Sequence, residues 1–297
     1  MKRIGIIGLG DMGIGLSKNI IKAGFELTGY DLREERLQLL ESLGGNRSTS
    51  VANVGESSDT VFVMVLNGQQ ACDVVGGPDG LVSSMKPGTT IIISATIKPS
   101  EVREVEKLLE GSGIDMVDTP VSGGKSGAEN GTLTMMAAAK KAVFDAQLDV
   151  LQAVGKDIFH VGEEIGMGQT IKASLQALIG STFAAIFESL VLGSKSGVPG
   201  KVLYEVFTSS GVRSPLLEGC AKLIMDREFK DTGSHIGTMY KDLGITMSVA
   251  RENGTAMFTT SAAYELFQSG ISLFPEEDNW SIVKLLEQIA GTEVTWD

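Results

Sequence analysis

The chain contains few of the side chains that build metal sites and disulfide frameworks. Among its 297 residues there are two cysteines, Cys72 and Cys220, and two histidines, His160 and His235. The cysteines give neither a zinc-binding spacing nor a disulfide framework, and they are typical of a protein from a reducing compartment. The sequence therefore predicts no metal site.

Positive charge is also scarce. The chain has 25 lysines and arginines against 37 aspartates and glutamates, a formal net charge of −12. Nucleic-acid backbones require a basic face, so we expect no nucleic-acid partner. A small anion is still a suitable ligand, because a local group of lysines and backbone N–H groups can outweigh the charge of the whole molecule.

Long apolar runs are absent as well. Glycines and Asp11 interrupt the N-terminal apolar run by residue 15, so we expect no signal peptide. Residues 171–195 are the most apolar stretch, but lysine, glutamine and glutamate side chains keep it well short of about 20 uninterrupted apolar residues. We expect a long buried helix here, no membrane partner and a cytoplasmic location.

Short runs rich in valine and isoleucine alternate with helical patterns in the first half of the chain. Such runs are typical of parallel strands covered on both faces, and the alternation indicates βαβ units. After about residue 165, long helices follow one another instead. The sequence predicts an α/β chain, with a doubly wound Rossmann domain over residues 1–165 and an all-helical domain over residues 166–297. The expected strands are RIGIIGL (3–9), ELTGYD (26–31), TVFVMVL (60–66), TTIIISAT (89–96) and IDMVDTP (114–120).

A glycine-rich loop, GIIGLGDMG, follows the first predicted strand and opens the first predicted helix. There, Gly8 permits a tight turn, Gly10 lets the backbone approach a pyrophosphate, and Gly13 lets the helix pack on the strand. Asp31 ends the second strand, where a carboxylate accepts hydrogen bonds from a ribose diol and repels a 2′-phosphate. Arg33 would pair with such a phosphate. The loop predicts a dinucleotide cofactor, and the sequence favours NAD while leaving NADP open.

A second glycine-containing loop, DTPVSGGKSGAENGTLT (118–134), includes the end of the last predicted strand. Ser122 and the successive N–H groups of Gly123 and Gly124 form a nest that can bind a carboxylate without a formal positive charge. The spacing excludes a Walker A loop and a nucleophile elbow, because threonine and proline stand where these motifs need glycine. From the residues alone, an ordinary loop is the alternative.

Two lysines stand out in the helical half. Lys172 comes early in the long helix, just after the predicted domain boundary, and Gln176 lies one turn later on the same face. A lysine desolvated in a cleft between domains can exchange a proton near neutral pH, whereas the alternative is an ordinary surface lysine. The second, Lys241, is followed by Asp242 in YKDLGIT, where the alternative is a solvated charged pair.

Taken in order, these stretches make the chain similar to the β-hydroxyacid dehydrogenase family, which includes 3-hydroxyisobutyrate, L-threonate and tartronate-semialdehyde enzymes. The resemblance extends over essentially the whole chain. It implies a Rossmann domain joined by a long helix to an all-helical domain for substrate binding and oligomerisation, in a homodimer or homotetramer. Its motifs are GLGDMG (8–13), SATI (94–97), DTPVSGG (118–124), GMGQTIK (166–172), KDL (241–243) and NWSIV (279–283).

The resemblance also implies roles for individual residues. Lys172 matches the catalytic lysine, and Ser122, Gly123 and Gly124 match the loop that holds the substrate carboxylate. Gln176 would contact the substrate beside them. The positions that match cofactor contacts are Gly8, Leu9, Gly10, Asp11, Met12, Gly13, Asp31, Leu66, Asn67, Thr96 and Lys241.

Four positions depart from the common family pattern. Leu175 and Gln176 replace an asparagine pair, Ala95 replaces a usual serine, and Thr119 replaces a frequent alanine. Glutamine at position 176 resembles the L-threonate dehydrogenase-like branch. Its amide can still donate a hydrogen bond, and we expect it to orient the substrate hydroxyl or a neighbouring polar group. These changes leave the reaction class intact and the substrate open.

We therefore expect an oxidoreductase that uses NAD to convert a small 3-hydroxy acid, of the 3-hydroxyisobutyrate or L-threonate kind, to the 3-oxo acid or semialdehyde. One alternative is an NADPH-dependent reductase of small aldehyde acids such as succinic or tartronate semialdehyde. Another is a dinucleotide-binding module without turnover.

Overall fold

The computed structural model describes residues 2–297, so Met1, the first residue of the predicted N-terminal domain, lies outside the described residues. The chain forms two compact units, Met1–Lys172 and Ala173–Asp297. Helix α9 (Met167–Lys195) begins in the first unit and continues into the second. The predicted boundary at residue 165 precedes this helix and stays a prediction.

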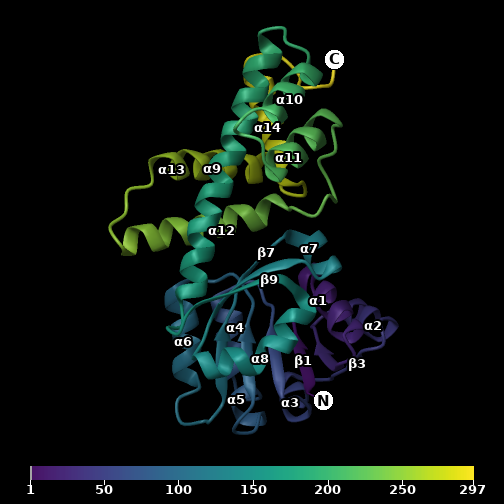
Figure 1. Ribbon diagram of the computed structural model, residues 1–297, viewed down its shortest axis with the longest axis vertical. Helices are drawn as coiled ribbons and strands as arrows, with labels where there is room; N and C mark the ends of the chain where they lie inside the picture. The colour runs from purple at the N-terminus through teal and green to yellow at the C-terminus, as the bar shows by residue number, and fades with distance from the viewer. Residues whose placement is uncertain (1) are drawn as a thin grey trace. The chain divides into compact units, whose positions relative to one another are not determined.

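The first unit is built on one sheet with the strand order β3-β2-β1-β4-β5-β6-β8-β7, and β9 pairs with β8 (Figure 1). The first six strands in this order are parallel, which is the doubly wound arrangement that the sequence predicts. The order reverses between β1 and β4, and ligands of such sheets bind at this point, outside the carboxyl ends of the strands. The strands are β1 (Arg3–Ile7), β2 (Glu26–Tyr30), β3 (Asn46–Arg47), β4 (Thr60–Val63), β5 (Thr90–Ile93), β6 (Asp115–Asp118), β7 (Val121–Ser122), β8 (Leu133–Ala138) and β9 (Gly155–Gly162).

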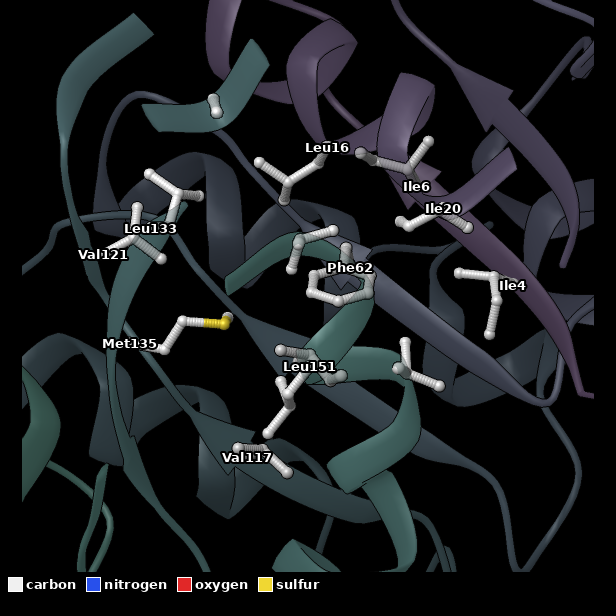
Figure 2. Packing of buried hydrophobic residues seen from close by; sticks show 14 of the residues in the cluster. Ile4, Ile6, Leu16, Ile20, Phe62, Val117, Val121, Leu133, Met135 and Leu151 are labelled. Atoms are coloured by element: carbon white, nitrogen blue, oxygen red, sulfur yellow. The ribbon is translucent and has the colours of Figure 1, made fainter. Parts of the chain in front are cut away.

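Helices cover both faces of this sheet, so its central strands are apolar on both sides. Ile6 and Phe62 point into a core with α1, α2 and α8 (Figure 2), whereas Ile7 and Val61 belong to a second core with α3, α4 and α6. The nearly continuous runs of the sequence reflect this two-sided burial. The helices are α1 (Asp11–Lys22), α2 (Glu34–Ser42), α3 (Val51–Ser57), α4 (Gly68–Gly76), α5 (Leu81–Ser84), α6 (Pro99–Leu108), α7 (Gly124–Asn130) and α8 (Lys141–Val154).

The second unit is helical throughout its regular structure, as predicted. Its core gathers aromatic side chains around Phe183 of α9, which meets Trp280 edge to face at 5.6 Å between ring centroids and Phe267 at 6.5 Å. Helix α9 is long and apolar enough by length and composition to cross a membrane, yet it supplies this core. The elements after α9 are α10 (Gly200–Ser209), α11 (Pro215–Met225), α12 (Ile236–Glu252), α13 (Phe258–Leu273), a 3-10 turn (Asn279–Ser281) and α14 (Ile282–Ala290).

Helix α9 begins at a buried carboxylate. Asp118, the last residue of β6, is fully buried, and its Oδ2 accepts hydrogen bonds from the backbone N–H groups of Gly166 at 3.0 Å and Gln169 at 3.4 Å. The first turn of a helix has unpaired N–H groups and a positive dipole end, both of which favour a carboxylate. Gly168 lets this turn pack closely, because a Cβ there would lie 2.4 Å from the carbonyl oxygen of Met136.

The side chain of Gln169 extends the same network. Its Nε2 donates to Asp118 Oδ1 at 2.8 Å and to the carbonyl oxygen of Ala95 at 3.0 Å, and its Oε1 accepts from the N–H of Ile97 at 3.1 Å. Gln169 is 1% exposed. The end of β6, the loop after β5 and the start of α9 are therefore held together by one amide and one carboxylate.

Burial of Asp118 predicts a pH-dependent stability. Burial raises the pKa of its carboxyl to about 6, against hydrogen bonds from Gln169 and Gly166 that lower it. Between the two pKa values, the folded state holds a proton that the unfolded state has lost. Protonation of Asp118 therefore increases the free energy of unfolding, and this contribution is complete below the unfolded pKa and is lost as pH rises through 6. In urea unfolding, we expect the wild type to gain about 2 kcal/mol over Asp118→Asn on going from about pH 7.5 to about pH 4.5.

Asp145→Asn serves as the control, because Asp145 lies on the exposed surface of α8. That variant should keep a nearly constant difference from the wild type over the same interval. The expectation would be contradicted if the difference in the free energy of unfolding between the wild type and Asp118→Asn were equally constant, or changed in the opposite direction.

Candidate active site

The glycine-rich loop connects β1 to α1 at the point where the strand order reverses. Gly8 has φ +93°, and a Cβ there would lie 2.2 Å from the carbonyl oxygen of Met64. A Cβ at Gly13 would lie 2.0 Å from the carbonyl oxygen of Gly8, whereas at Gly10 the nearest atom is 4.0 Å away, on Arg33. Two glycines are thus needed for packing, and the third leaves open space beside the loop.

The start of α1 lies at this open space. Gly10 is the N-cap residue and supplies no side-chain cap, Asp11 is exposed, Met12 is half-buried and Leu9 is fully buried. The first N–H groups of α1 are suited to an anionic ligand because of their positive dipole end.

Asp31 directly follows β2 and is held in place by the loop. Its Oδ2 accepts from the N–H of Leu9 at 2.7 Å, and its Oδ1 accepts from the N–H and Nε of Arg33 at 2.9 and 3.1 Å. Partial burial raises the pKa of Asp31, but the hydrogen bonds from Arg33 and Leu9 outweigh it and hold the pKa below its ordinary value. A carboxylate therefore lies beside the glycine-rich loop, paired with Arg33, an arginine that would suit a 2′-phosphate.

Three further predicted cofactor contacts follow the carboxyl ends of neighbouring strands. Leu66 and Asn67 follow β4; Leu66 is 71% exposed, and the side chain of Asn67 caps α4 by accepting from the N–H of Gln70. Thr96 follows β5, is half-buried, and lies between Ala95 and Ile97, the two residues whose backbone binds Gln169.

The predicted carboxylate-binding loop turns through two successive glycines with positive φ. Ser122 ends β7 half-buried, and Gly123 and Gly124 follow it, both exposed, with φ +131° and +60°. Side chains are strained at such φ values, so glycine is needed at both positions. The structure thus places the N–H groups of consecutive glycines at the start of α7, open to solvent.

Lys172 is a buried lysine, not the ordinary surface lysine of the alternative reading. It is 7% exposed, in the second turn of α9, three residues after Gln169. Buried lysines are rare in proteins unless their ammonium group has a role or a partner. The network of Asp118 fixes the turn that precedes Lys172, and so the direction in which α9 presents it.

In the second unit, Gln176 of α9 meets α12. Its Nε2 donates to Oδ2 of Asp242 at 2.7 Å, and both residues are buried. Asp242 Oδ1 lies 2.8 Å from Nζ of Lys241, which is half-buried. Lys241 and Asp242 therefore do not form the solvated pair of the alternative reading, because the carboxylate is withdrawn from water and bound to Gln176.

Sequence reasoning missed three polar residues of these networks: Asp118, Gln169 and Asp242. Each lies within a motif that was recognised, DTPVSGG, GMGQTIK or KDL, but the residues inside those motifs received no role. The available signal was a polar side chain in an otherwise apolar segment, which is informative when its partner is known. Their partners lie 51 and 66 residues away in the sequence.

The residues of the first unit fit a dinucleotide. The open space at Gly10, the uncapped start of α1 and the carboxylate of Asp31 supply sites for a pyrophosphate and for a ribose diol. Within residues 2–297, no three His, Cys, Asp or Glu side chains gather into a group that could hold a metal ion.

Comparison with known proteins agrees with this fold and these motifs. Residues 3–162 match the family model of the NAD binding domain of 6-phosphogluconate dehydrogenase, and residues 166–286 match that of the NAD-binding region of NADP-dependent 3-hydroxyisobutyrate dehydrogenase. Among curated relatives, 2-(hydroxymethyl)glutarate dehydrogenase of Eubacterium barkeri is 35% identical over 99% of this chain and 97% of its own. L-threonate dehydrogenase of Escherichia coli K12 is 31% identical over 96% of this chain and 95% of its own.

A solved structure of a related protein has a similar fold. The crystal structure of a 3-hydroxyisobutyrate dehydrogenase from Salmonella typhimurium has a TM-score of 0.86 and 29% identity, and the match covers 96% of this chain and 100% of that one. The match therefore includes both units, each with its own fold. The chain belongs to the β-hydroxyacid dehydrogenase family and is an NAD(P)-dependent oxidoreductase of hydroxy acids.

Proposed function

We propose that the chain oxidises a small 3-hydroxy acid to the 3-oxo acid or semialdehyde, preferably with NAD, and that Lys172 is its catalytic residue. The observation that carries this proposal is the burial of Lys172 directly after a helix start that Asp118 and Gln169 fix. A module that only bound a dinucleotide would have no use for a buried ammonium group at that position.

The residues divide the chemistry between them. The N–H groups of Gly123 and Gly124, with the Ser122 hydroxyl, bind the substrate carboxylate and so orient the substrate. Neutral Lys172 accepts the proton of the substrate hydroxyl as its carbon is oxidised, and protonated Lys172 returns it in the reverse reaction. The nicotinamide cofactor, when bound, accepts the hydride.

Cofactor contacts are proposed for the remaining residues. Residues 8–13 bind the pyrophosphate at the start of α1, and Asp31 accepts hydrogen bonds from the adenosine ribose. Leu66 and Asn67 lie beside the adenosine, and Thr96 and Lys241 contact the cofactor, as their matches to the family pattern imply. The ion pair of Asp31 with Arg33 supports NAD, since the guanidinium is already engaged.

Relatives suggest two kinds of substrate. One named relative acts on 2-(hydroxymethyl)glutarate and another on L-threonate. We propose a small hydroxy acid of this range, with Gln176 contacting its substituents. Reduction of a small aldehyde acid with NADPH is the second candidate, which Arg33 favours. The homodimer or homotetramer and the cytoplasmic location stay predictions.

Lys172→Ala tests the proposed reaction. A spectrophotometric screen of C3–C5 hydroxy acids and semialdehydes with both cofactors identifies the substrate, and kcat is then measured for the variant. We expect kcat to fall by about 100- to 10,000-fold, because general acid–base catalysis contributes rate factors of that size. The Kd for NADH, measured by fluorescence, should change little.

Lys195→Ala is the matched control, since Lys195 ends the same helix and is exposed. It should retain both activity and cofactor binding. If Lys172→Ala kept the wild-type kcat on the identified substrate, the assignment of the catalytic residue would be wrong.

Asp31→Ala tests the cofactor preference. The substitution removes the charge that repels a 2′-phosphate and frees Arg33 to pair with one. We expect the ratio of kcat/KM with NADP to that with NAD to rise by about tenfold or more, as the gain of a charged hydrogen bond allows.

Adding Arg33→Ala to Asp31→Ala should reverse most of that rise, because the phosphate would lose its partner. A wild type that already prefers NADP, or a ratio that Asp31→Ala leaves unchanged, would argue for the reductase candidate instead.

A further inference from the structure

The side-chain amide of Gln176 has a fixed orientation. Its Nε2 donates to Oδ2 of Asp242 at 2.7 Å and lies 3.6 Å from the sulfur of Met239, a weak acceptor. A carboxylate can only accept hydrogen bonds, so the NH₂ end of the amide must face Asp242. Gln176 is 7% exposed and Asp242 is 4% exposed, so little water competes for this hydrogen bond.

This orientation determines what Gln176 can offer to another molecule. The NH₂ end of the amide is engaged by two acceptors, Asp242 and Met239. The carbonyl oxygen is therefore the group left for a ligand, and it requires a donor. The amide of Gln176 does donate a hydrogen bond, but to Asp242, so a ligand would meet its carbonyl oxygen.

We propose that Asp242 is a positioning residue that turns the carbonyl oxygen of Gln176 toward the substrate, so that the site selects an acid with a hydrogen-bond donor on a carbon adjacent to the one that is oxidised. This inference rests on the proposed function. In that function the proton of the reacting hydroxyl goes to Lys172 and the carboxylate goes to the Ser122–Gly124 loop, so only a neighbouring substituent remains for Gln176. Gln176 follows Lys172 by one turn of α9.

The chemical class of substrate follows from the acceptor. A hydroxyl on the adjacent carbon, as in a vicinal dihydroxy acid such as threonate, donates to Oε1. An ammonium group on that carbon shares this property. A methyl group does not, and a second carboxylate would bring acceptor against acceptor, which is unfavourable in a buried site.

The experiment compares substrates that differ in one substituent. With NAD, kcat/KM is measured for 3-hydroxypropionate, 3-hydroxyisobutyrate, glycerate and serine, which carry hydrogen, methyl, hydroxyl and ammonium on the carbon beside the reacting one. L-Threonate is compared with 2- and 3-hydroxybutyrate in the same way. We expect the hydroxyl compounds to exceed the methyl and hydrogen compounds by about 3- to 10-fold, the size of one hydrogen bond. The serine arm separates a hydroxyl donor from an ammonium donor.

Variants of Gln176 and Asp242 then test whether these two residues cause the preference for hydroxyl over methyl compounds. Gln176→Met keeps a similar length without hydrogen bonds, and Asp242→Asn can donate as well as accept, so the amide of Gln176 is free to turn. Both should reduce the hydroxyl-to-methyl ratio to within about twofold of one. Glu252→Gln, an exposed residue of the same helix α12, removes one charge and should leave the ratio unchanged.

The possible failures are distinguishable. The role of Gln176 and Asp242 is overturned if the hydroxyl-to-methyl ratio of kcat/KM is unchanged in Gln176→Met, or if the wild type prefers the methyl compound. If Asp242→Asn does not fold, Gln176→Met alone decides the question. Oxidation that persists at the wild-type rate in Lys172→Ala, or an absence of turnover with every hydroxy acid, overturns the proposed function instead. NADH binding and circular dichroism confirm that each variant is folded.

Discussion

One buried carboxylate sets the positions of the functional segments in the first unit. Asp118 accepts hydrogen bonds from the start of α9 and from Gln169, whose amide in turn binds the loop after β5 on both sides of Thr96. Removing a carboxylate from water is costly, as its raised pKa of about 6 shows. The hydrogen bonds offset part of this cost only while the donors are in place, which ties the three segments to one another.

The residues with proposed roles lie next to this network in the sequence. Thr96 lies between the two residues that Gln169 binds, Ser122 follows Asp118 by four residues through β7, and Lys172 follows Gln169 by three residues in α9. A shift at any one of them would leave a buried donor or acceptor unpaired, which costs about 1–3 kcal/mol. In the proposed reaction, proton transfer and hydride transfer both depend on precise placement of the reacting groups, to which such a network contributes.

Local features of the chain could be predicted from the sequence, whereas contacts between residues far apart in the sequence could not. The five predicted strands and the glycine-rich turn depend on residues that are close together in the sequence, so their patterns are readable. β3, β7, β8 and β9 were not predicted. β8, for example, pairs antiparallel with β6 and parallel with β9, and nothing in a short segment specifies such neighbours. The same limit hid the partner of Asp242, which lies 66 residues from it.

Helix α9 shows why periodicity alone was insufficient. Polar Gln169 and Lys172 are buried, whereas Leu178 and Leu192 are 66% and 69% exposed. A reading that places apolar residues inside would assign the faces of this helix the wrong way round at those positions. Gln169 is inside because its amide joins Asp118, Ala95 and Ile97, and that requirement is visible only once the partners are known.

The same reasoning applies to residue roles taken from a family pattern. An amide side chain is a donor or an acceptor depending on which end its neighbour holds, and a change of neighbour reverses it without any change of the residue itself. Gln176 donates its NH₂ group to Asp242, so the end that it offers to another molecule is set by that neighbour. Substrate preference at this position is thus a property of the pair, and two chains that share the glutamine would share the preference only where the acceptor behind it is also a carboxylate.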